Sequence, residues 1–102
     1  MDELDRYAKG FHALGSNARL QIYIELLRHE PEGLNVKDLQ EKVEMKASTL
    51  AHHLRTLVEA GLVRQEQRGK ESINRAVRSE LESLCSGITS RCCEAGVCSC
   101  RK

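Results

Sequence analysis

Apolar residues recur every three or four positions along most of the chain, which is the spacing of one face of an α-helix. The first such stretch covers residues 4–14, and Ser16 is placed to cap a second helix over residues 17–29. This second helix is apolar on most of its sides, so we expect it to form the buried centre of the fold. Pro31 and Gly33 end it.

Two further helical stretches follow, separated by a tight turn. Asn35 is placed to cap a short third helix, and residues 46–60 continue the helical spacing almost at once. Gly61 stands where a left-handed residue commonly ends a helix. Two short helices of which the second presents one polar face predict a helix-turn-helix.

The pattern changes after residue 61. Residues 62–67 and 71–77 flank the sequence Arg68-Gly69-Lys70, and a glycine at the first central position of a two-residue loop suits a type II′ hairpin. Because both arms are rich in charge, we expect this hairpin to stand in water as a flap rather than to pack in the core.

A last helix is predicted from the capping-box spacing of Ser79 and Glu82. The apolar periodicity stops beyond Ser90. We therefore expect a mainly α fold with a small β-hairpin, a winged helix-turn-helix, within residues 1–90. Residues 91–102 are expected to form a separate cysteine-rich tail.

Composition sets limits on this fold. With 102 residues, 40% apolar and 30% charged, the chain has room for one small domain and is too apolar for wholesale disorder. Nothing approaches the roughly 18 consecutive apolar residues of a membrane span, and the acidic N-terminus is unlike a signal peptide, so we expect a cytoplasmic protein without membrane contact. With only two Tyr and one Phe as aromatics, the core is thin, so we expect a homodimer in which a second copy covers an apolar face.

The net charge of +1 conceals a strong segregation of charge. Residues 1–45 carry six cations against nine anions, a net of −3, whereas residues 46–78 carry seven against three, a net of +4. Such a local excess is typical of a surface that binds a polyanion. Charge alone leaves a merely solvated basic surface as the alternative.

If the apolar residues of the 46–60 helix face inward, its outer face carries Ser48, Thr49, His52 and Arg55, and His53 flanks this face. Small hydroxyls and imidazoles near a helix N-terminus can bond base edges in the major groove, and flanking cations can contact phosphates. Cations at the hairpin tip would reach the neighbouring backbone or minor groove. A surface of this kind predicts double-stranded DNA as the partner, with these candidate contact residues: Lys46, Ser48, Thr49, His52, His53, Arg55, Arg68 and Lys70.

Cysteine is concentrated at the end of the chain, where four of the five cysteines fall within the last eleven residues. Without a secretory signal, such a cluster favours metal or redox chemistry over structural disulfides. Soft thiolates select thiophilic centres: trivalent arsenic suits three thiolates, and zinc or cadmium would suit the four of this cluster. A thiol-redox switch remains the alternative. Cys85, on the apolar stripe of the last helix, is expected to pack as a small core residue.

Enzymatic chemistry is not expected. The chain contains no Cys-x-x-Cys motif, no glycine-rich phosphate loop and no alternation of strands and helices that would build a pocket.

The runs ALGSNARLQIYIELLRHE, STLAHHLRTLVEAGLV and RQEQRGKE resemble the ArsR/SmtB family of metal-responsive repressors over residues 8–78. The resemblance implies a homodimer built on the first and last helices, which represses an operon until a metal or metalloid binds. Many members carry cysteines in the third helix, but residues 36–40 here contain no sulfur. Others bind zinc through Asp and His on the last helix, and residues 79–90 contain neither.

Arsenite-responsive members of the family are similar in having a Cys-Cys pair just past the last helix and a third cysteine a few residues on. On that resemblance the expected ligands of trivalent arsenic or antimony are Cys92, Cys93 and Cys98, with Cys100 as an alternate. The implied function is a repressor of arsenic-resistance genes that leaves its DNA when the inducer binds. The alternatives are a thiol-redox repressor or a repressor responding to cadmium, zinc, lead or mercury.

Overall fold

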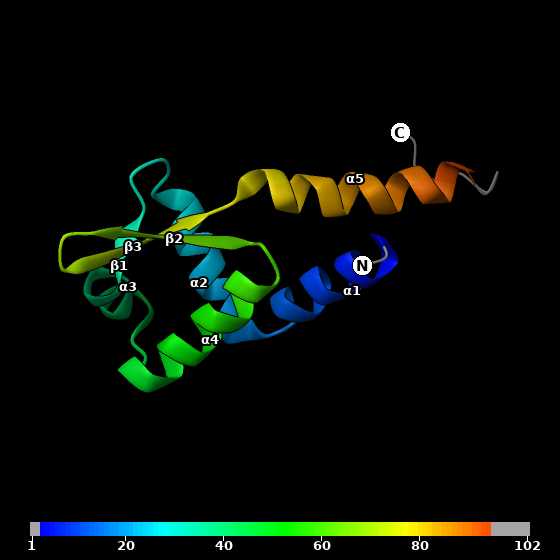
Figure 1. Cartoon of the computed structure of the whole chain (residues 1–102). Coiled ribbons are helices and arrows are strands. Elements are labelled where there is room, and N and C mark those ends of the chain that lie inside the picture. Colours follow the sequence, from blue (N-terminus) through cyan, green and yellow to red (C-terminus); the bar gives the residue numbers. More distant parts are fainter. Residues whose placement is uncertain (1–2, 95–102) are drawn as a thin grey trace.

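The computed structural model describes residues 3–94 of the chain. In that part, the chain forms five helices and a small three-stranded antiparallel sheet of strand order β1-β3-β2 (Figure 1). The elements are α1 (Glu3–Leu14), α2 (Asn17–Arg28), β1 (Leu34–Asn35), α3 (Val36–Val43), α4 (Ala47–Glu59), β2 (Val63–Arg68), β3 (Glu71–Ala76) and α5 (Arg78–Glu94). The predicted mainly α winged helix-turn-helix is confirmed.

Local chemistry sets most of the element boundaries. The Ser16 hydroxyl accepts a hydrogen bond from the Arg19 backbone N–H at the start of α2, and Asn35 Oδ1 accepts one from Asp38 at 2.7 Å at the start of α3. Gly61 follows α4 with a φ of +81°, and Gly69 turns the hairpin with a φ of +60°. These positive angles are the reason for glycine at both places.

The core lies between α2, α3, α4 and the sheet, which together form the head of the molecule. Large aliphatic side chains from every one of these helices are fully buried there, among them Ile22, Leu26, Leu39, Leu50 and Leu57. The expectation that α2 forms the buried centre of the fold holds for one side only: Ile22, Tyr23 and Leu26 are buried, whereas Leu20 is 43% exposed and Ile24 is 39% exposed. α2 packs on α3, α4 and β3, and no other element described here covers its exposed side.

Tyr23 joins the head to the start of α5. Its ring is buried, and its hydroxyl donates a hydrogen bond to the Val77 carbonyl at 3.1 Å, one residue before α5 begins. Burial is the largest cause that raises the pKa of Tyr23 to about 12, followed by the nearby Glu30 carboxylate.

The hairpin is anchored more firmly than its charged sequence predicts. β3 pairs with β1 as well as with β2, and Asn74 in β3 is fully buried. The Asn74 amide donates to the Leu34 carbonyl and accepts a hydrogen bond from Gln65. The expectation of a free flap is therefore correct only for the outer part: Arg64 to Lys70 is exposed, whereas the base of the hairpin is part of the core.

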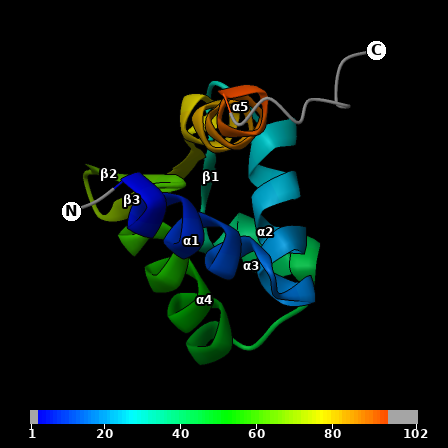
Figure 2. The same cartoon turned by 90° about the vertical axis from the view of Figure 1, so that its right-hand side faces the viewer.

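α1 and α5 form a second unit, the stem, which extends beyond the head (Figures 1 and 2). Tyr7 of α1 is buried against Gly87 of α5, and a Cβ atom on Gly87 would overlap the Tyr7 ring. Gly10 lies in the same way against Leu84. The two helices thus approach closely because glycine stands at both contact points.

α5 is longer than predicted at both ends. It begins at Arg78, so Ser79 lies within its first turn instead of capping it. It continues to Glu94, so the expected helix end at Ser90 is wrong and the backbone of residues 91–94 is helical. The contact with α1 extends to Arg91, which pairs with Glu3 at 3.0 Å.

Cys85 is exposed in the described chain, which contradicts the prediction that it packs in the core. Leu84 occupies the position against α1, and the neighbouring residue consequently points elsewhere. Over residues 3–94, none of the helices is both long enough and apolar enough to cross a membrane.

Candidate nucleic-acid interface

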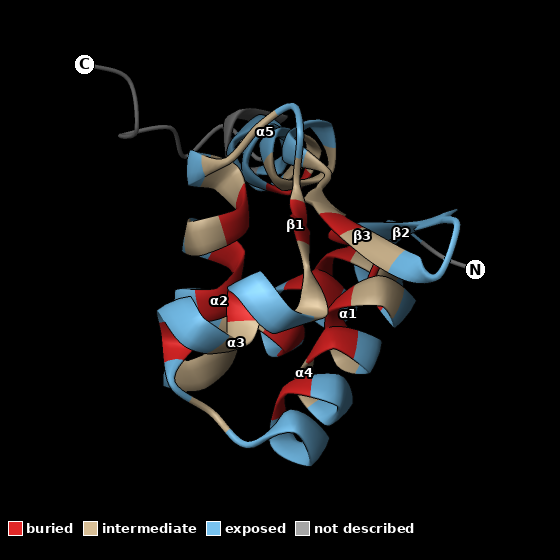
Figure 3. Cartoon of the chain, turned by 90° about the vertical axis from the view of Figure 1, so that its left-hand side faces the viewer, coloured by how far each residue is buried: buried red, intermediate tan, exposed pale blue. Residues whose placement is uncertain are grey.

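One side of α4 is built into the head and the other faces solvent. Leu50, Leu54 and Leu57 are buried, which is the 3–4 residue spacing of an inward face. Figure 3 shows the corresponding buried turns of α4 against the head and its exposed outer surface. Four of the predicted contact residues are exposed on this helix: Ser48, Thr49, His52 and Arg55.

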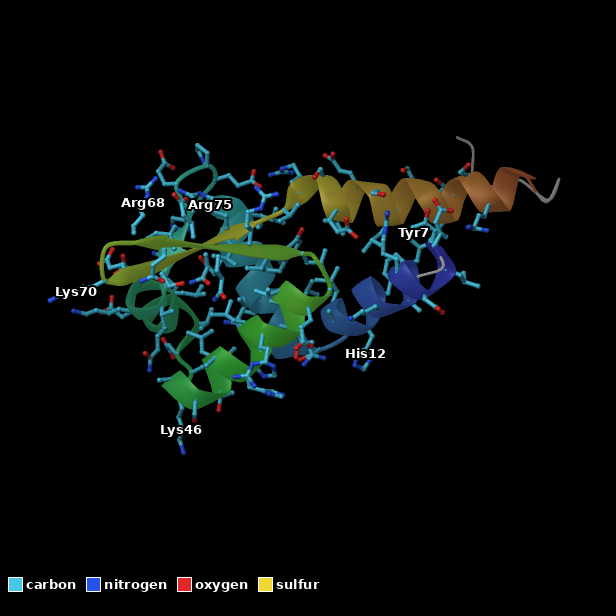
Figure 4. All side chains as sticks on the ribbon, viewed as in Figure 1. Tyr7, His12, Lys46, Arg68, Lys70 and Arg75 are labelled. Atoms are coloured by element: carbon cyan, nitrogen blue, oxygen red, sulfur yellow. The ribbon has the colours of Figure 1, made fainter. Side chains whose placement is uncertain are left out.

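Lys46 lies just before the first turn of α4. Its carbonyl accepts a hydrogen bond from the Leu50 N–H at 2.9 Å, while its side chain makes no capping bond. Figure 4 shows the Lys46 side chain projecting from this end of α4, away from the core. A cation beside the free N–H groups of a helix N-terminus suits a phosphate group.

The hairpin tip presents a second set of cations. Arg68 and Lys70 project beyond the strands in Figure 4, and both are exposed. Arg68 lies 3.6 Å from the Glu66 carboxylate, which also binds Arg75, and the hydrogen bond from Arg75 is the largest cause that lowers the pKa of Glu66. Glu66 therefore remains charged and offsets part of the positive charge of the wing.

The segment with a net charge of +4 thus contains two kinds of cation. Arg75 and Arg78 bind Glu66 and Glu30. Three of the predicted contact cations have no ion-pair partner within residues 3–94: Lys46, Arg55 and Lys70. These three cations lie on α4 and on the wing, the two elements that a winged helix presents to DNA.

His53 is placed differently from the other predicted residues. Its side chain is half-buried, and its Nδ1 lies 3.3 Å from Arg19 Nη1. A guanidinium can only donate, so Nδ1 is the acceptor. Burial is the main cause that lowers the pKa of His53, with the Arg19 and His52 charges adding to the effect. A neutral His53 held by Arg19 thus flanks the outer face, as predicted.

Sequence reasoning missed Arg19, whose side chain links three helices. No periodicity connects position 19 to position 53, so only the folded chain reveals this contact. Asn74 was missed as well, because an asparagine in a charged strand gives no sign of burial.

The predicted inducer ligands are only partly within the described structure. Cys92 and Cys93 belong to the helical backbone of α5, but their side chains are not described. Cys98 and the alternate Cys100 lie outside the described residues. Within the described part, no group of three or more His, Cys, Asp or Glu residues is arranged to hold a metal ion.

The head therefore offers an exposed polar helix face with a cation at its start and a second group of cations on a hairpin beside it. A protruding helix of this diameter fits the major groove of B-DNA, and an adjacent hairpin can reach the flanking backbone.

Comparison with known proteins agrees with this geometry. Residues 14–66 match a family of helix-turn-helix domains. No curated protein matches the sequence of the chain. An ArsR-like transcriptional regulator from Rhodococcus sp. RHA1 has a similar structure, with a TM-score of 0.83, 26% identity, and coverage of 91% of this chain and 85% of that one.

Two other solved structures are similar over most of their length. A possible transcriptional regulator for arsenical resistance is 25% identical, with a TM-score of 0.66 and coverage of 79% of this chain and 81% of that one. The homodimeric winged helix-turn-helix DNA-binding domain of Mb0332 from Mycobacterium bovis is 22% identical, with a TM-score of 0.71 and coverage of 86% and 80%. The similarity to the Mycobacterium bovis domain shows a shared fold and nothing more.

Proposed function

We propose that this chain, which belongs to the helix-turn-helix family, is a DNA-binding transcriptional regulator of the ArsR type and that it is an arsenic-responsive repressor. A similar structure is that of an ArsR-like transcriptional regulator. In this proposal a homodimer binds operator DNA and releases it when trivalent arsenic or antimony binds Cys92, Cys93 and Cys98. Release then allows transcription of arsenic-resistance genes. As a regulator of this family, the chain is not an enzyme.

The observation that carries the DNA-binding part is the exposed polar face of α4 beside the wing. Ser48, Thr49 and His52 are assigned to base edges, because their side chains are exposed and can both donate and accept hydrogen bonds. The exposed cations are assigned to phosphates, which position the protein without reading sequence. These cations are Lys46, Arg55, Arg68 and Lys70.

Exposed apolar side chains on the stem support a homodimer. Phe11 on α1 is 41% exposed and Ile88 on α5 is 42% exposed, and Cys85 lies three residues before Ile88. A second copy that covers this surface would remove apolar area from water. The similar DNA-binding domain from Mycobacterium bovis is homodimeric. In a dimer of this kind, two α4 helices would enter successive major grooves, roughly 10 bp apart.

The chemistry of the donor set supports arsenic as the inducer. The proposed ligands are all thiols, which favour soft thiophilic centres over hard oxygen-preferring cations. Three thiols replace the three hydroxyl groups of arsenous acid and release three waters, with no change of oxidation state. Cys100 is retained as the alternate ligand. A similar structure is that of a possible regulator for arsenical resistance.

The helical position of the Cys92-Cys93 pair suggests how binding could reach the DNA. Arg91 directly precedes the pair and binds Glu3 of α1 at 3.0 Å. Its guanidinium also lies 5.7 Å from the centre of the Tyr7 ring. A change in the last turn of α5 would therefore act on α1. Repression is lost if the inducer-bound state binds DNA more weakly by a few kcal/mol, since about 1.4 kcal/mol is tenfold in affinity.

The test is a fluorescence-anisotropy titration of a duplex that the full chain enriches from a randomised library. It is repeated with arsenite, antimonite, Cd²⁺, Zn²⁺ and a thiol oxidant. We expect arsenite and antimonite to release the duplex, and the Cys93→Ser variant to bind DNA normally but to remain bound in arsenite. Cys85→Ser is the matched control, because this thiol is exposed on the same helix and is not a proposed ligand.

Full arsenite response in Cys93→Ser would disprove the ligand assignment. Release by the oxidant but not by arsenite would favour the thiol-redox alternative. Affinity should also fall by orders of magnitude between about 50 and 200 mM salt, because several phosphate contacts release counterions.

A further inference from the structure

The Arg19 side chain binds the C-terminal end of α1 and the middle of α4. Its Nε donates a hydrogen bond to the Ala13 carbonyl at 2.7 Å, and its Nη2 donates to the His12 carbonyl at 3.4 Å. Its Nη1 donates to His53 Nδ1 at 3.3 Å. One guanidinium at the start of α2 therefore connects the C-terminal end of α1 to α4.

The Arg19 side chain is held both by the carbonyls that it binds and by its own fixed backbone. The carbonyls at the C-terminus of a helix have no helical partner and form the negative end of the helix dipole, so they attract a cation. The backbone of Arg19 is itself fixed, because its N–H donates to the Ser16 hydroxyl in the cap of α2. The guanidinium is a planar, fork-shaped donor group. Because its hydrogen-bond partners and the Arg19 backbone are both fixed, the side chain has little conformational freedom.

Anchoring His53 fixes the direction in which the neighbouring residues of α4 point. Successive residues of an α-helix are separated by about 100° around its axis. If His53 is held against Arg19, then His52 and Thr49 are held in the exposed orientations that the structure shows. The two imidazole rings are adjacent, with 5.7 Å between their centres.

We propose that Arg19 is a positioning residue for DNA recognition. By binding His53 of α4 and the C-terminal end of α1 together, it sets the rotation of α4 about its axis and hence the direction in which the side chains that contact bases point. This inference rests on the proposed DNA binding. Arg19 itself does not contact DNA in this proposal. Because α1 belongs to the stem, the same contact transmits a movement of the stem to α4.

The test measures binding to two duplexes, one enriched by the full wild-type chain from a randomised library and one of unselected sequence. Arg19→Met should weaken binding to the enriched duplex by about three- to thirtyfold, the range typical of couplings that bypass the ligand. Binding to the unselected duplex and the dependence of affinity on salt should change little, because no phosphate contact is lost.

Arg28→Met is the matched control. Arg28 lies on the same helix and carries the same charge, but it is exposed and pairs only with Glu25 in the described part of the chain. Its removal should leave the preference between the two duplexes unchanged. Circular dichroism and urea unfolding establish that each variant is folded at the temperature of the assay.

A second pair of variants separates positioning from general stability. His53→Asn keeps an acceptor oxygen near the place of Nδ1 and should retain most of the preference for the enriched duplex. His53→Phe removes the acceptor and should lose as much preference as Arg19→Met. Combining Arg19→Met with His53→Phe should cost no more preference for the enriched duplex than Arg19→Met alone, because both variants break the same Arg19–His53 contact.

Three results would overturn the inference. Equal behaviour of Arg19→Met and Arg28→Met would show that the contact does not position α4. If Arg19→Met lost affinity equally for both duplexes and released about one counterion fewer on binding, Arg19 would be shown to contact a phosphate. If the wild-type chain enriches no duplex at all, the proposed DNA binding fails together with the inference, and this result differs from the other two.

Discussion

The head and the stem are held together in different ways. In the head, fully buried leucines from α3 and α4 pack on α2, and buried Asn74 is hydrogen-bonded on both sides. In the stem, two helices share a narrow contact in which Tyr7 lies on Gly87 and Leu84 on Gly10. Large apolar side chains are exposed in both units, Phe11 and Ile88 in the stem and Leu20 and Ile24 on the outer side of α2, but only the head has a cluster of fully buried leucines.

This difference indicates separate roles for the two units. A tightly packed head keeps the α4 face and the wing in a fixed relation, which recognition of a rigid duplex requires. The exposed apolar side chains of the stem, Phe11 and Ile88, are suited to association. Two of the proposed inducer ligands, Cys92 and Cys93, belong to the last residues of α5 in the stem.

The largest expected effect is in the head. Leu57→Ala should lower the free energy of unfolding by about 2–5 kcal/mol, because Leu57 is fully buried and the surrounding side chains cannot close the cavity completely. Urea unfolding followed by circular dichroism measures this loss. Leu20→Ala, at a position that is 43% exposed, is the control and should cost less than about 1 kcal/mol. Similar losses in both variants would contradict the view of a tightly packed head.

An added methyl group tests the contact within the stem. Gly87→Ala should destabilise the chain by about 1–3 kcal/mol, because the new Cβ overlaps the Tyr7 ring and forces α1 away from α5. Urea unfolding and size-exclusion chromatography measure stability and association. Ser86→Ala, at the exposed neighbouring position, is the control. If Gly87→Ala were as stable as Ser86→Ala, the close contact between the helices would not exist in solution.

The joint between head and stem has a pH-dependent stability. The pKa of Tyr23 is about 12 in the folded chain and about 10 in the unfolded chain, so its contribution is complete below pH 10 and is lost as pH rises towards 12. The free energy of unfolding should therefore fall by about 2 kcal/mol more in the wild type than in Tyr23→Phe over this interval. Urea unfolding from pH 9 to 12 measures the difference. Parallel curves for the two proteins would refute the assignment.

The order and most boundaries of the elements could be predicted from the sequence. Ser16 and Asn35 cap the helices that they were expected to cap, and Gly61 and Gly69 have the positive φ that their turns require. These features depend on the hydrogen bonds and sterics of a few adjacent residues. The exposed face of α4 follows equally from its 3–4 residue spacing.

Features that depend on distant contacts could not be predicted. His53 flanks the outer face of α4 as predicted, but its contact with Arg19, 34 residues earlier, could not be predicted. Cys85 was expected in the core and is exposed, because Leu84 occupies the contact with α1. α5 was expected to end at Ser90, yet it continues to Glu94 alongside α1, with Arg91 bound to Glu3.

The amino-acid sequence by itself determined the helices, the hairpin, the segregation of charge and the cluster of terminal thiols, since each depends on neighbouring residues or on composition alone. The tertiary structure decided which polar residues are exposed, which one anchors α4, and how far α5 extends along α1. The physical reason is that burial and hydrogen bonding between residues far apart in sequence exist only after the chain has folded and brought them together.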